Sequence, residues 1–462
     1  MVTSTIQEAR IKGLNDRPPR KGAYVLYWMQ QSQRARYNHA LEYAVDCSNE
    51  LQLPLLVGFG LTADYPEANL RHYTFMLEGL AHTRQALEER GIQMVLQIGD
   101  PPQVILELAR KAAAVVCDCG YTRHQKKWRR EVAENADCRV VQVESDVVVP
   151  VGLVSPKAEY AARTIRPKIK WKHDACLKQV RAHKLKYPSL ALKVDSRDLD
   201  NIDDLLKELD LDESVPPVSR FFPGGAHHAR RRFNAFLKHS LKHYDEHHNQ
   251  PQTDDISGMS PYLHFGQISP LYLALRATGK NVRYPDAVAS YIEELIIRRE
   301  LAVNFVHYSD DYDAYGCLPE WARESLEKHR RDKRPHTYSR SQLEDADTHD
   351  PYWNAAMREM RYTGFMHNYM RMYWGKKILE WSASPQKAYE TTLALNNKYF
   401  LDGRDPNSFV GVGWTYGLHD RAWFERDIFG KVRYMAASGL ERKCDIQGYV
   451  KKVDALVKKA SR

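Results

Sequence analysis

Aromatic, methionine and charged side chains gather in two stretches, residues 363–381 and 393–417, and could together support electron transfer. Trp374 and Trp381 are seven residues apart, which is two helical turns, so both lie on nearly one face at roughly 10 Å. Asn368 and Arg371, three residues apart, are also neighbours on a helix. Two interpretations follow: an aromatic-rich helical core, or a redox cofactor pocket with aromatic electron relays.

Two serines suggest a second kind of chemistry. Ser257 and Ser260 stand where a loop meets an expected helix, and their hydroxyl and backbone N–H groups could hold a phosphate. Serines at such a boundary are also typical helix N-caps. The segment 223–244 before them is a basic amphipathic helix that opens with two glycines. Residue types alone leave both interpretations of the serines open.

Composition restricts the class of protein. The chain has 462 residues, of which 43% are hydrophobic, and its formal net charge is +9. This length predicts two or three domains. The charge favours a polyanionic partner such as nucleic acid, although many basic proteins carry lysine only for solubility.

The same composition argues against several locations and site types. No apolar run reaches membrane-spanning length and the N-terminal residues lack an apolar h-region, so neither membrane insertion nor secretion is expected. Seven scattered cysteines, an odd number, indicate a reducing compartment. No set of cysteines and histidines stands at zinc spacing, so no metal site is expected.

The elements that position these residues fall into two halves. Five short apolar runs, 23–28, 53–60, 92–99, 113–119 and 138–144, alternate with helical segments. This alternation predicts a doubly wound, Rossmann-like α/β domain over residues 20–150. Its first turn lacks G-x-G-x-x-G, so ordinary dinucleotide binding is not expected there. Residues 151–222 read as an interdomain linker, and residues 223–462 as a large all-helical domain.

Ordered motifs then resemble a known family. They are the Gly-Gly helix, Tyr244, SGMSPYLHFG (257–266), EELIIRREL (293–301), TGFMHN (363–368) and DGRDPN (402–407). Together they resemble the DNA photolyase/cryptochrome family. RRELAVNF, RMYWGKKILEW, LDGRDPNSFVGVGW and FGKVRYM are similar to the wording of class II cyclobutane pyrimidine dimer photolyases. The resemblance spans nearly the whole chain.

The resemblance implies FAD in the helical domain. The implied cofactor-binding residues are Tyr244, Ser257, Met259, Ser260, Asn368, Arg371, Asp402 and Asp405. Arg371 is expected to pair with Asp402, since a buried guanidinium needs a carboxylate and would stabilise a negatively charged reduced flavin. Asn396 is expected near flavin N5, with Asn407 in reserve. Trp374, Trp353 and Trp381 are expected to form the electron relay, in that order from the flavin outward.

The substrate side also follows from the resemblance. A pyrimidine dimer must leave the duplex to reach a buried flavin. Trp414 and Met372 are expected to pack against it, and Glu294, with a pKa raised by burial, to hydrogen-bond a thymine carbonyl. The alternative for Glu294 is an ordinary helix salt bridge to Arg298. Candidate phosphate contacts are Arg232, Arg421, Arg426, Lys431 and Arg433.

The expected activity is light-dependent repair of cyclobutane pyrimidine dimers by electron transfer from photoexcited reduced FAD. The first alternative is a cryptochrome, a photoreceptor without repair activity, although the chain ends soon after Met435 without the long tail common in those proteins. Others are repair of (6-4) photoproducts and a flavin-free DNA-binding module. We expect a monomer acting in the cytoplasm, near the nucleoid of a prokaryote, or in a eukaryotic nucleus. The α/β domain is expected to hold an antenna, 8-hydroxy-deazaflavin or methenyltetrahydrofolate.

Overall fold

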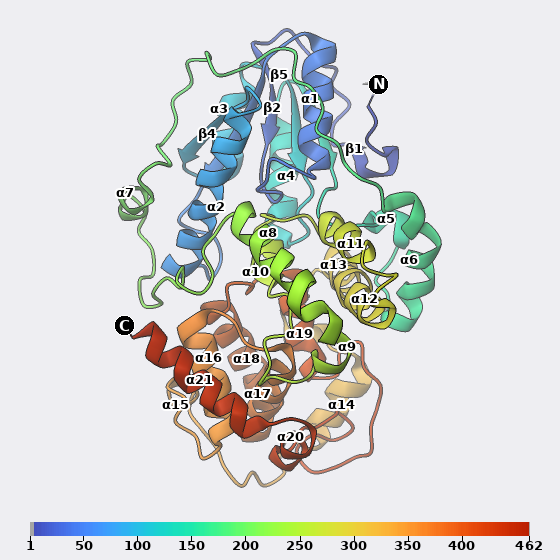
Figure 1. Cartoon of the computed structure of the whole chain (residues 1–462), viewed down its shortest axis with the longest axis vertical. Helices are drawn as coiled ribbons and strands as arrows, with labels where there is room; N and C mark the ends of the chain where they lie inside the picture. Colours follow the sequence, from blue (N-terminus) through green and yellow to red (C-terminus); the bar gives the residue numbers. More distant parts are fainter. Residues whose placement is uncertain (1–3, 462) are drawn as a thin grey trace.

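The computed structural model describes residues 4–461, and the first half of this chain is built around one sheet (Figure 1). The strand order is β1-β6-β5-β2-β3-β4. Neighbouring strands run parallel, except that β1 pairs antiparallel with β6, with Ile11 opposite Val143. The strands are β1 (Ile11–Gly13), β2 (Tyr24–Trp28), β3 (Leu55–Leu61), β4 (Gln93–Ile98), β5 (Ala112–Asp118) and β6 (Arg139–Val143). The five predicted runs are all strands, and β1 is an addition that the sequence does not predict.

Helices cover both faces of this sheet, because alternate residues of its strands point to opposite sides. Val25 and Tyr27 of β2 pack with residues of α1 and α2, whereas Leu26 and Trp28 pack with residues of α3 and α4. These helices are α1 (His39–Leu51), α2 (Leu70–Glu88), α3 (Pro101–Ala109) and α4 (Arg123–Asn135), and the short 3-10 helix η1 (Glu8–Arg10) precedes the sheet. The expected doubly wound domain is therefore present.

The segment between the two halves is partly ordered against each of them. Helices α5 (Val151–Val154) and α6 (Ala162–Cys176) follow the sheet, and Ile165 and Ile169 of α6 are buried in a core shared with α12. The chain then runs along β4, where the Arg197 N–H donates to the Leu96 carbonyl at 2.7 Å, and leads to α7 (Ile202–Lys207). This run covers the exposed edge of the sheet. The domain limits 20–150, 151–222 and 223–462 remain predictions.

The second half is helical, as expected, and lies below the sheet in Figure 1. The described part of the chain beyond residue 223 contains no strand, only an isolated bridge between Arg426 and Gly430. Its helices are α8 (Ala226–Ala235), η2 (Phe236–Ser240), η3 (Leu241–His243), α9 (Tyr244–His247), α10 (Ser260–His264), α11 (Pro270–Thr278), α12 (Pro285–Ile292), η4 (Glu293–Arg298), α13 (Arg299–Tyr308), η5 (Tyr315–Cys317), α14 (Glu320–Lys328), α15 (Arg340–Glu344), α16 (Pro351–Thr363), α17 (Asn368–Trp381), α18 (Pro385–Tyr399), α19 (Pro406–Thr415), α20 (Ala437–Lys443) and α21 (Ile446–Ala460). Two of these, η2 and η4, are π-helical turns.

Buried polar side chains connect the two halves. Arg71 of α2 donates to the carbonyls of Pro216, Met360, Tyr399 and Arg361. In the opposite direction, the Glu300 carboxyl of α13 accepts the backbone N–H groups that follow β6, at Val148 and Val149. Because buried polar groups must be hydrogen-bonded, these contacts fix how the halves meet.

Two further sequence-based expectations concern membrane-spanning helices and disulfides. Within residues 4–461 no helix is both long enough and apolar enough to cross a bilayer. All seven cysteines are free thiols, and Cys117 and Cys119 are buried in or beside β5.

Candidate active site

One large cavity in the helical half brings the predicted chemistry together. Its volume is about 590 Å³, within the usual size range of small-molecule sites. The predicted residues that line it are Tyr244, Ser257, Met259, Ser260, Glu294, Asn368, Arg371, Met372, Trp374, Asn396, Asp402, Asp405 and Trp414. Residues separated by up to 170 positions thus line one cavity.

The loop before α10 forms one end of this cavity. Gly258 has φ +62°, a left-handed conformation that glycine adopts without strain. Met259, rather than either serine, occupies the N-cap position of α10, so the serine hydroxyls are not used as caps of that helix. Arg232 lies behind the loop, stacked 4.2 Å from the Phe222 ring centroid and donating to the Phe221 carbonyl at 2.7 Å.

An ion pair marks the middle of the cavity, as expected from the sequence. Arg371 on α17 binds Asp402 with two parallel hydrogen bonds, each 3.0 Å long. Its guanidinium also lies 3.9 Å from the centroid of the Phe400 ring and donates to the Met366 carbonyl. This bidentate arrangement holds a permanent positive charge in a fixed place.

Asp405 begins α19 and also faces the cavity. Its Oδ1 accepts from the backbone and side-chain nitrogens of Asn407 at 2.8 and 3.0 Å. His264 lies 3.3 Å from its Oδ2. Burial acts to raise the pKa of Asp405, but His264 and the other partners outweigh it, and the pKa is lowered. Asp405 is therefore a carboxylate at neutral pH.

The amide of Asn396 has a fixed orientation. Its Nδ2 donates to Asn397 Oδ1 at 2.9 Å and to Ser408 Oγ at 2.7 Å. Asn397 is itself oriented, because its Nδ2 donates to the Glu67 carboxylate at 2.6 Å and its Oδ1 accepts the Arg404 N–H at 3.2 Å. With Nδ2 engaged, Asn396 presents its amide oxygen as an acceptor.

Glu294 lies in the π-helical turn η4. The adjacent Glu293 binds Arg166 at 2.6 Å and Arg298 at 3.2 Å, so Arg298 pairs with Glu293 rather than with Glu294. The Glu294 side chain is exposed where the cavity opens, but the cavity walls restrict its hydration, and this desolvation raises its pKa, with Glu293 adding to the effect against Arg298. Such a carboxyl can keep a proton and donate a hydrogen bond. Trp414 and Met372 are half-buried residues of the same cavity.

Three tryptophans lead away from the cavity. Trp374 and Trp381 share α17, as predicted, and Trp353 comes from α16. The Trp353 indole N–H donates to the Trp374 carbonyl at 3.0 Å, and the Trp353 and Trp381 ring centroids are 5.6 Å apart. Trp374 Nε1 is buried and has no hydrogen-bond partner in the described chain. The Trp353 and Trp381 rings are therefore in direct contact, and Trp353 reaches the backbone of Trp374, which lines the cavity.

Sequence comparison identifies the relatives of this chain. The DNA photolyase family model matches residues 25–188. The deoxyribodipyrimidine photo-lyase of Methanothermobacter thermautotrophicus is 50% identical, over 98% of this chain and 99% of that protein. The Arabidopsis thaliana protein of the same name is 38% identical, over 98% of this chain and 94% of its own length. The chain belongs to the DNA photolyase family. These relatives confirm the family resemblance of the motifs. They also confirm the predicted enzyme class, deoxyribodipyrimidine photo-lyase.

Solved structures agree with this photolyase fold. A bacterial class III photolyase from Agrobacterium tumefaciens superposes with a TM-score of 0.72, covering 96% of this chain and 90% of that chain at 17% identity. A cryptochrome from Synechocystis gives the same TM-score and identity, covering 93% of this chain and 88% of its own. At such low identity these likenesses establish the fold alone. The predicted combination of α/β and helical domains is confirmed.

The photolyase carries a basic loop beside the cavity. Arg421, Arg426 and Lys431 are exposed and Arg433 is half-buried, whereas Arg232 lies apart, behind the loop of Ser257. Arg433 stacks near both Trp414, at 5.9 Å, and the exposed Trp423, at 5.0 Å. Arginines interleaved with exposed aromatic rings are typical of surfaces that bind single-stranded nucleic acid.

A second, smaller cavity of about 80 Å³ lies between the two halves of the photolyase. Its walls include Trp28 and Leu61, at the carboxyl ends of β2 and β3, and His264 and Arg404 from the helical half. The carboxyl ends of parallel strands are the usual ligand sites of doubly wound sheets. This location agrees with the cleft in which an antenna is expected.

The sequence did not indicate several residues that support the site. Lys376 is buried beneath Trp414, its Nζ donates to the Thr415 carbonyl, and burial lowers its pKa to about 7. Glu67 and Asn397 orient Asn396. The one sequence signal for Lys376 is the lysine pair Lys376-Lys377 within a helix rich in apolar residues. No sequence signal links Glu67 to Asn397, which lies 330 positions further along the chain.

Proposed function

We propose that this photolyase is a class II enzyme that splits cyclobutane pyrimidine dimers in DNA by light-driven electron transfer from reduced FAD. One observation carries the proposal: a single cavity combines a serine-glycine loop, a fixed positive charge, an oriented amide and a wall of Trp414, Met372 and Glu294. The relatives named deoxyribodipyrimidine photo-lyase, at 37–50% identity over nearly the whole chain, support it.

The residues present fit FAD. The loop of Ser257, Met259 and Ser260, with Tyr244, would hold its phosphates and ribityl chain. Asn368, Arg371 with Asp402, and Asp405 would lie along the isoalloxazine ring, with Arg371 compensating negative charge. The free oxygen of Asn396 suits an N–H donor such as that of reduced N5. When bound and reduced, FAD supplies the light absorption and the electron that opens the cyclobutane ring.

The opposite wall suits a flipped dimer. A dimer leaves the duplex more readily than normal bases because it stacks poorly. Trp414 and Met372 would pack against its pyrimidines, and protonated Glu294 would donate a hydrogen bond to a thymine carbonyl. The basic loop, with Arg421, Arg426, Lys431 and Arg433, would hold the flanking phosphates, and Arg232 would do so only after leaving its place behind the Ser257 loop.

The tryptophan series would bring electrons inward to reactivate an oxidised flavin. Trp374 would donate first, followed by Trp353 and Trp381. Direct contact between Trp353 and Trp381 and the hydrogen bond from Trp353 to Trp374 support this order. The smaller cavity would receive the antenna, a deazaflavin or a folate, and its aromatic lining with Trp28 and Trp128 suits a flat ring.

The deciding experiment is anaerobic and optical. The purified protein is photoreduced, mixed with DNA that contains cyclobutane thymine dimers, and followed at 260 nm with and without blue light. Splitting restores the 5,6 double bonds, so a light-dependent rise in absorbance supports the proposal. A protein that photoreduces and binds the damaged DNA, yet gives no rise, would instead be a cryptochrome or act on another lesion.

A further inference from the structure

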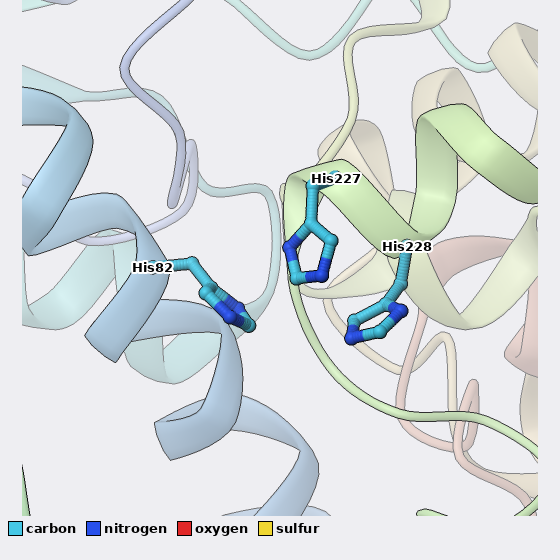
Figure 2. A group of neighbouring side chains, drawn as sticks. All are labelled: His82, His227 and His228. Atoms are coloured by element: carbon cyan, nitrogen blue, oxygen red, sulfur yellow. The ribbon is translucent and has the colours of Figure 1, made fainter.

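Three histidines from the two halves of the chain face one another, and none of them lines the large cavity (Figure 2). His82 lies near the end of α2, and His227 and His228 occupy the first turn of α8. One ring nitrogen from each residue lies within 4.8 Å of the others. The centroid of the His227 ring lies 4.1 Å from that of His82 and 3.7 Å from that of His228.

Two glycines make this approach possible. Gly225 precedes α8 with φ +121°, and a Cβ there would lie 2.3 Å from His82 Nδ1. A Cβ on Gly224 would lie 2.1 Å from the Phe75 carbonyl oxygen of α2. The Gly-Gly pair therefore allows the start of α8 to pack directly on α2 and brings His227 and His228 to His82.

The hydrogen bonding of these rings leaves coordinating atoms free. His82 Nδ1 is buried, points at the start of α8 and has no hydrogen-bond partner among residues 4–461. Several described histidines have such a nitrogen, and His82 differs from them because it lies against two further imidazoles.

We propose that His82, His227 and His228 form a binding site for a divalent transition metal ion of the Zn²⁺ class. Imidazole nitrogens are ligands that such ions prefer, whereas Mg²⁺ and Ca²⁺ require oxygen ligands. Three protein ligands leave the fourth tetrahedral position to water. The site is separate from the flavin cavity and takes no part in the proposed repair reaction.

The geometry requires only a small adjustment. Zn–N bonds of about 2.0–2.1 Å in a tetrahedron place ligand nitrogens roughly 3.4 Å apart, compared with separations of up to 4.8 Å here. Rotation of the exposed His227 ring can close this difference. Arg231, which donates to His228 Nδ1 at 3.1 Å, must release that ring. Arg231 is exposed and can do so, which also moves its positive charge away from the bound cation.

A bound ion would join the two halves through helix α8, which also supports one loop of the large cavity. The α8 helix that carries His227 and His228 also carries Arg232, which packs against Gly258 in the loop of Ser257. Fixing the first turn of α8 to α2 would therefore stiffen the support of that loop. Because the ion binds the folded chain and not the unfolded one, it also raises thermal stability.

A second cluster, His329 with Asp332 and Asp427, does not offer free ligand atoms. His329 already uses Nδ1 with Asp332 at 2.6 Å and Nε2 with Glu425 at 2.9 Å. Asp332 also accepts the Ile428 N–H at 2.8 Å. These bonds account for that cluster as a structural network.

The test is calorimetric titration of Zn²⁺ into the tag-free, metal-stripped full-length protein with its flavin bound. We expect one ion per chain, an increase in Tm on binding, and no heat from Mg²⁺. His82→Ala and His227→Ala should each weaken Zn²⁺ binding about tenfold or more. His239→Ala is the matched control, since His239 is exposed in the next turns of the same helical segment, and it should bind as the parent does.

Two outcomes would overturn the site. Either the parent protein binds no Zn²⁺ at millimolar concentration, or both variants bind it with unchanged affinity. His227 is exposed, so His227→Ala remains decisive even if His82→Ala fails to fold. X-ray absorption at the zinc edge adds an independent reading, because scattering from imidazole rings is expected and a shell of oxygens alone would contradict the assignment.

Discussion

At the scale of single residues, the orientation of one amide determines what the large cavity can accept. Asn396 presents oxygen because Asn397 and Ser408 engage its nitrogen, and Asn397 is held by the Glu67 carboxylate. The chemistry proposed for Asn396 thus depends on a residue from a loop before α2. Groups that orient a reacting residue are often nearly as important as that residue.

The first prediction concerns this chain of amides. Asn397→Ala removes the acceptor that fixes Asn396, so the flavin should stay bound but reduced flavin should reoxidise faster in air. Asn396→Ala should show the same effect more strongly. The measurement is the flavin absorption spectrum during reoxidation after photoreduction. Unchanged reoxidation in Asn396→Ala would transfer the role at N5 to Asn407.

The second prediction concerns the proton of Glu294. Its pKa is raised above the ordinary value of 4.5, chiefly by burial, so the carboxyl donates a hydrogen bond below that raised pKa and loses the donor as pH increases through it. Repair yield of the parent enzyme should therefore fall on the alkaline side. Glu294→Gln keeps a donor and should flatten this profile, and Glu294→Ala should lower the yield at every pH. Loss of flavin from Glu294→Ala would indicate a structural role instead.

Expectations about the partners of single residues are confirmed where a local sequence motif supported them. The pairing of Arg371 with Asp402 followed from two motifs and is present, with two bonds of 3.0 Å. The salt bridge considered for Glu294 with Arg298 is made by Glu293 instead, because a π-helical turn changes which side chains are neighbours. Helical spacing alone could not predict that change of register.

At the scale of elements, α16 and α17 hold the tryptophan series. The third prediction is that Trp374→Phe slows photoreduction of oxidised flavin by an order of magnitude or more, because the ring that contacts the cavity can no longer donate. Repair by enzyme that is already reduced should be nearly unchanged. Both rates are measured on the same preparation under anaerobic illumination. Loss of both would contradict the assignment and indicate damage to the cavity.

The basic loop of residues 418–436 supplies the fourth prediction. Removing two exposed charges with Arg421→Gln and Lys431→Gln should weaken binding of damaged DNA and reduce the slope of log affinity against log salt by about 0.9 for each lost phosphate contact. Fluorescence anisotropy at several salt concentrations measures the slope. Arg110→Gln, an exposed change at the end of α3, is the control and should leave the slope unaltered.

Elements with long, uniform patterns could be predicted, and short or irregular ones could not. The runs that became β2 to β6 contain no exposed residue, so largely apolar sequence marked them. Strand β1 has three residues of which two are exposed, and only its pairing with β6 makes it a strand. The histidine cluster joins α2 to α8 across 145 positions, which no local spacing reveals.

At the scale of the whole molecule, buried ionisable groups make stability depend on pH. The fifth prediction concerns Glu300, whose pKa burial raises to about 8 despite its backbone N–H partners. Between 4.5 and about 8 the unfolded chain releases this proton while the folded chain keeps it. Stability should therefore fall as pH rises through that window, by up to about 1.4 kcal/mol per pH unit from this group.

Glu300→Gln provides the comparison, because an amide oxygen can still accept from Val148 and Val149. The difference in unfolding free energy between parent and variant should change steadily with pH from 5 to 8 in urea titrations. A difference that stays constant over this range would show that Glu300 is ionised in the folded protein.

The Arg71 side chain has a consequence for how the molecule can come apart. It binds carbonyls from three separate segments of the helical half and connector, at Pro216, at Met360 and Arg361, and at Tyr399. Separating the halves would break all four of these hydrogen bonds at once. This side chain therefore opposes a hinge motion between the two halves. We therefore expect the large cavity and the smaller cavity between the halves to keep a fixed distance from each other.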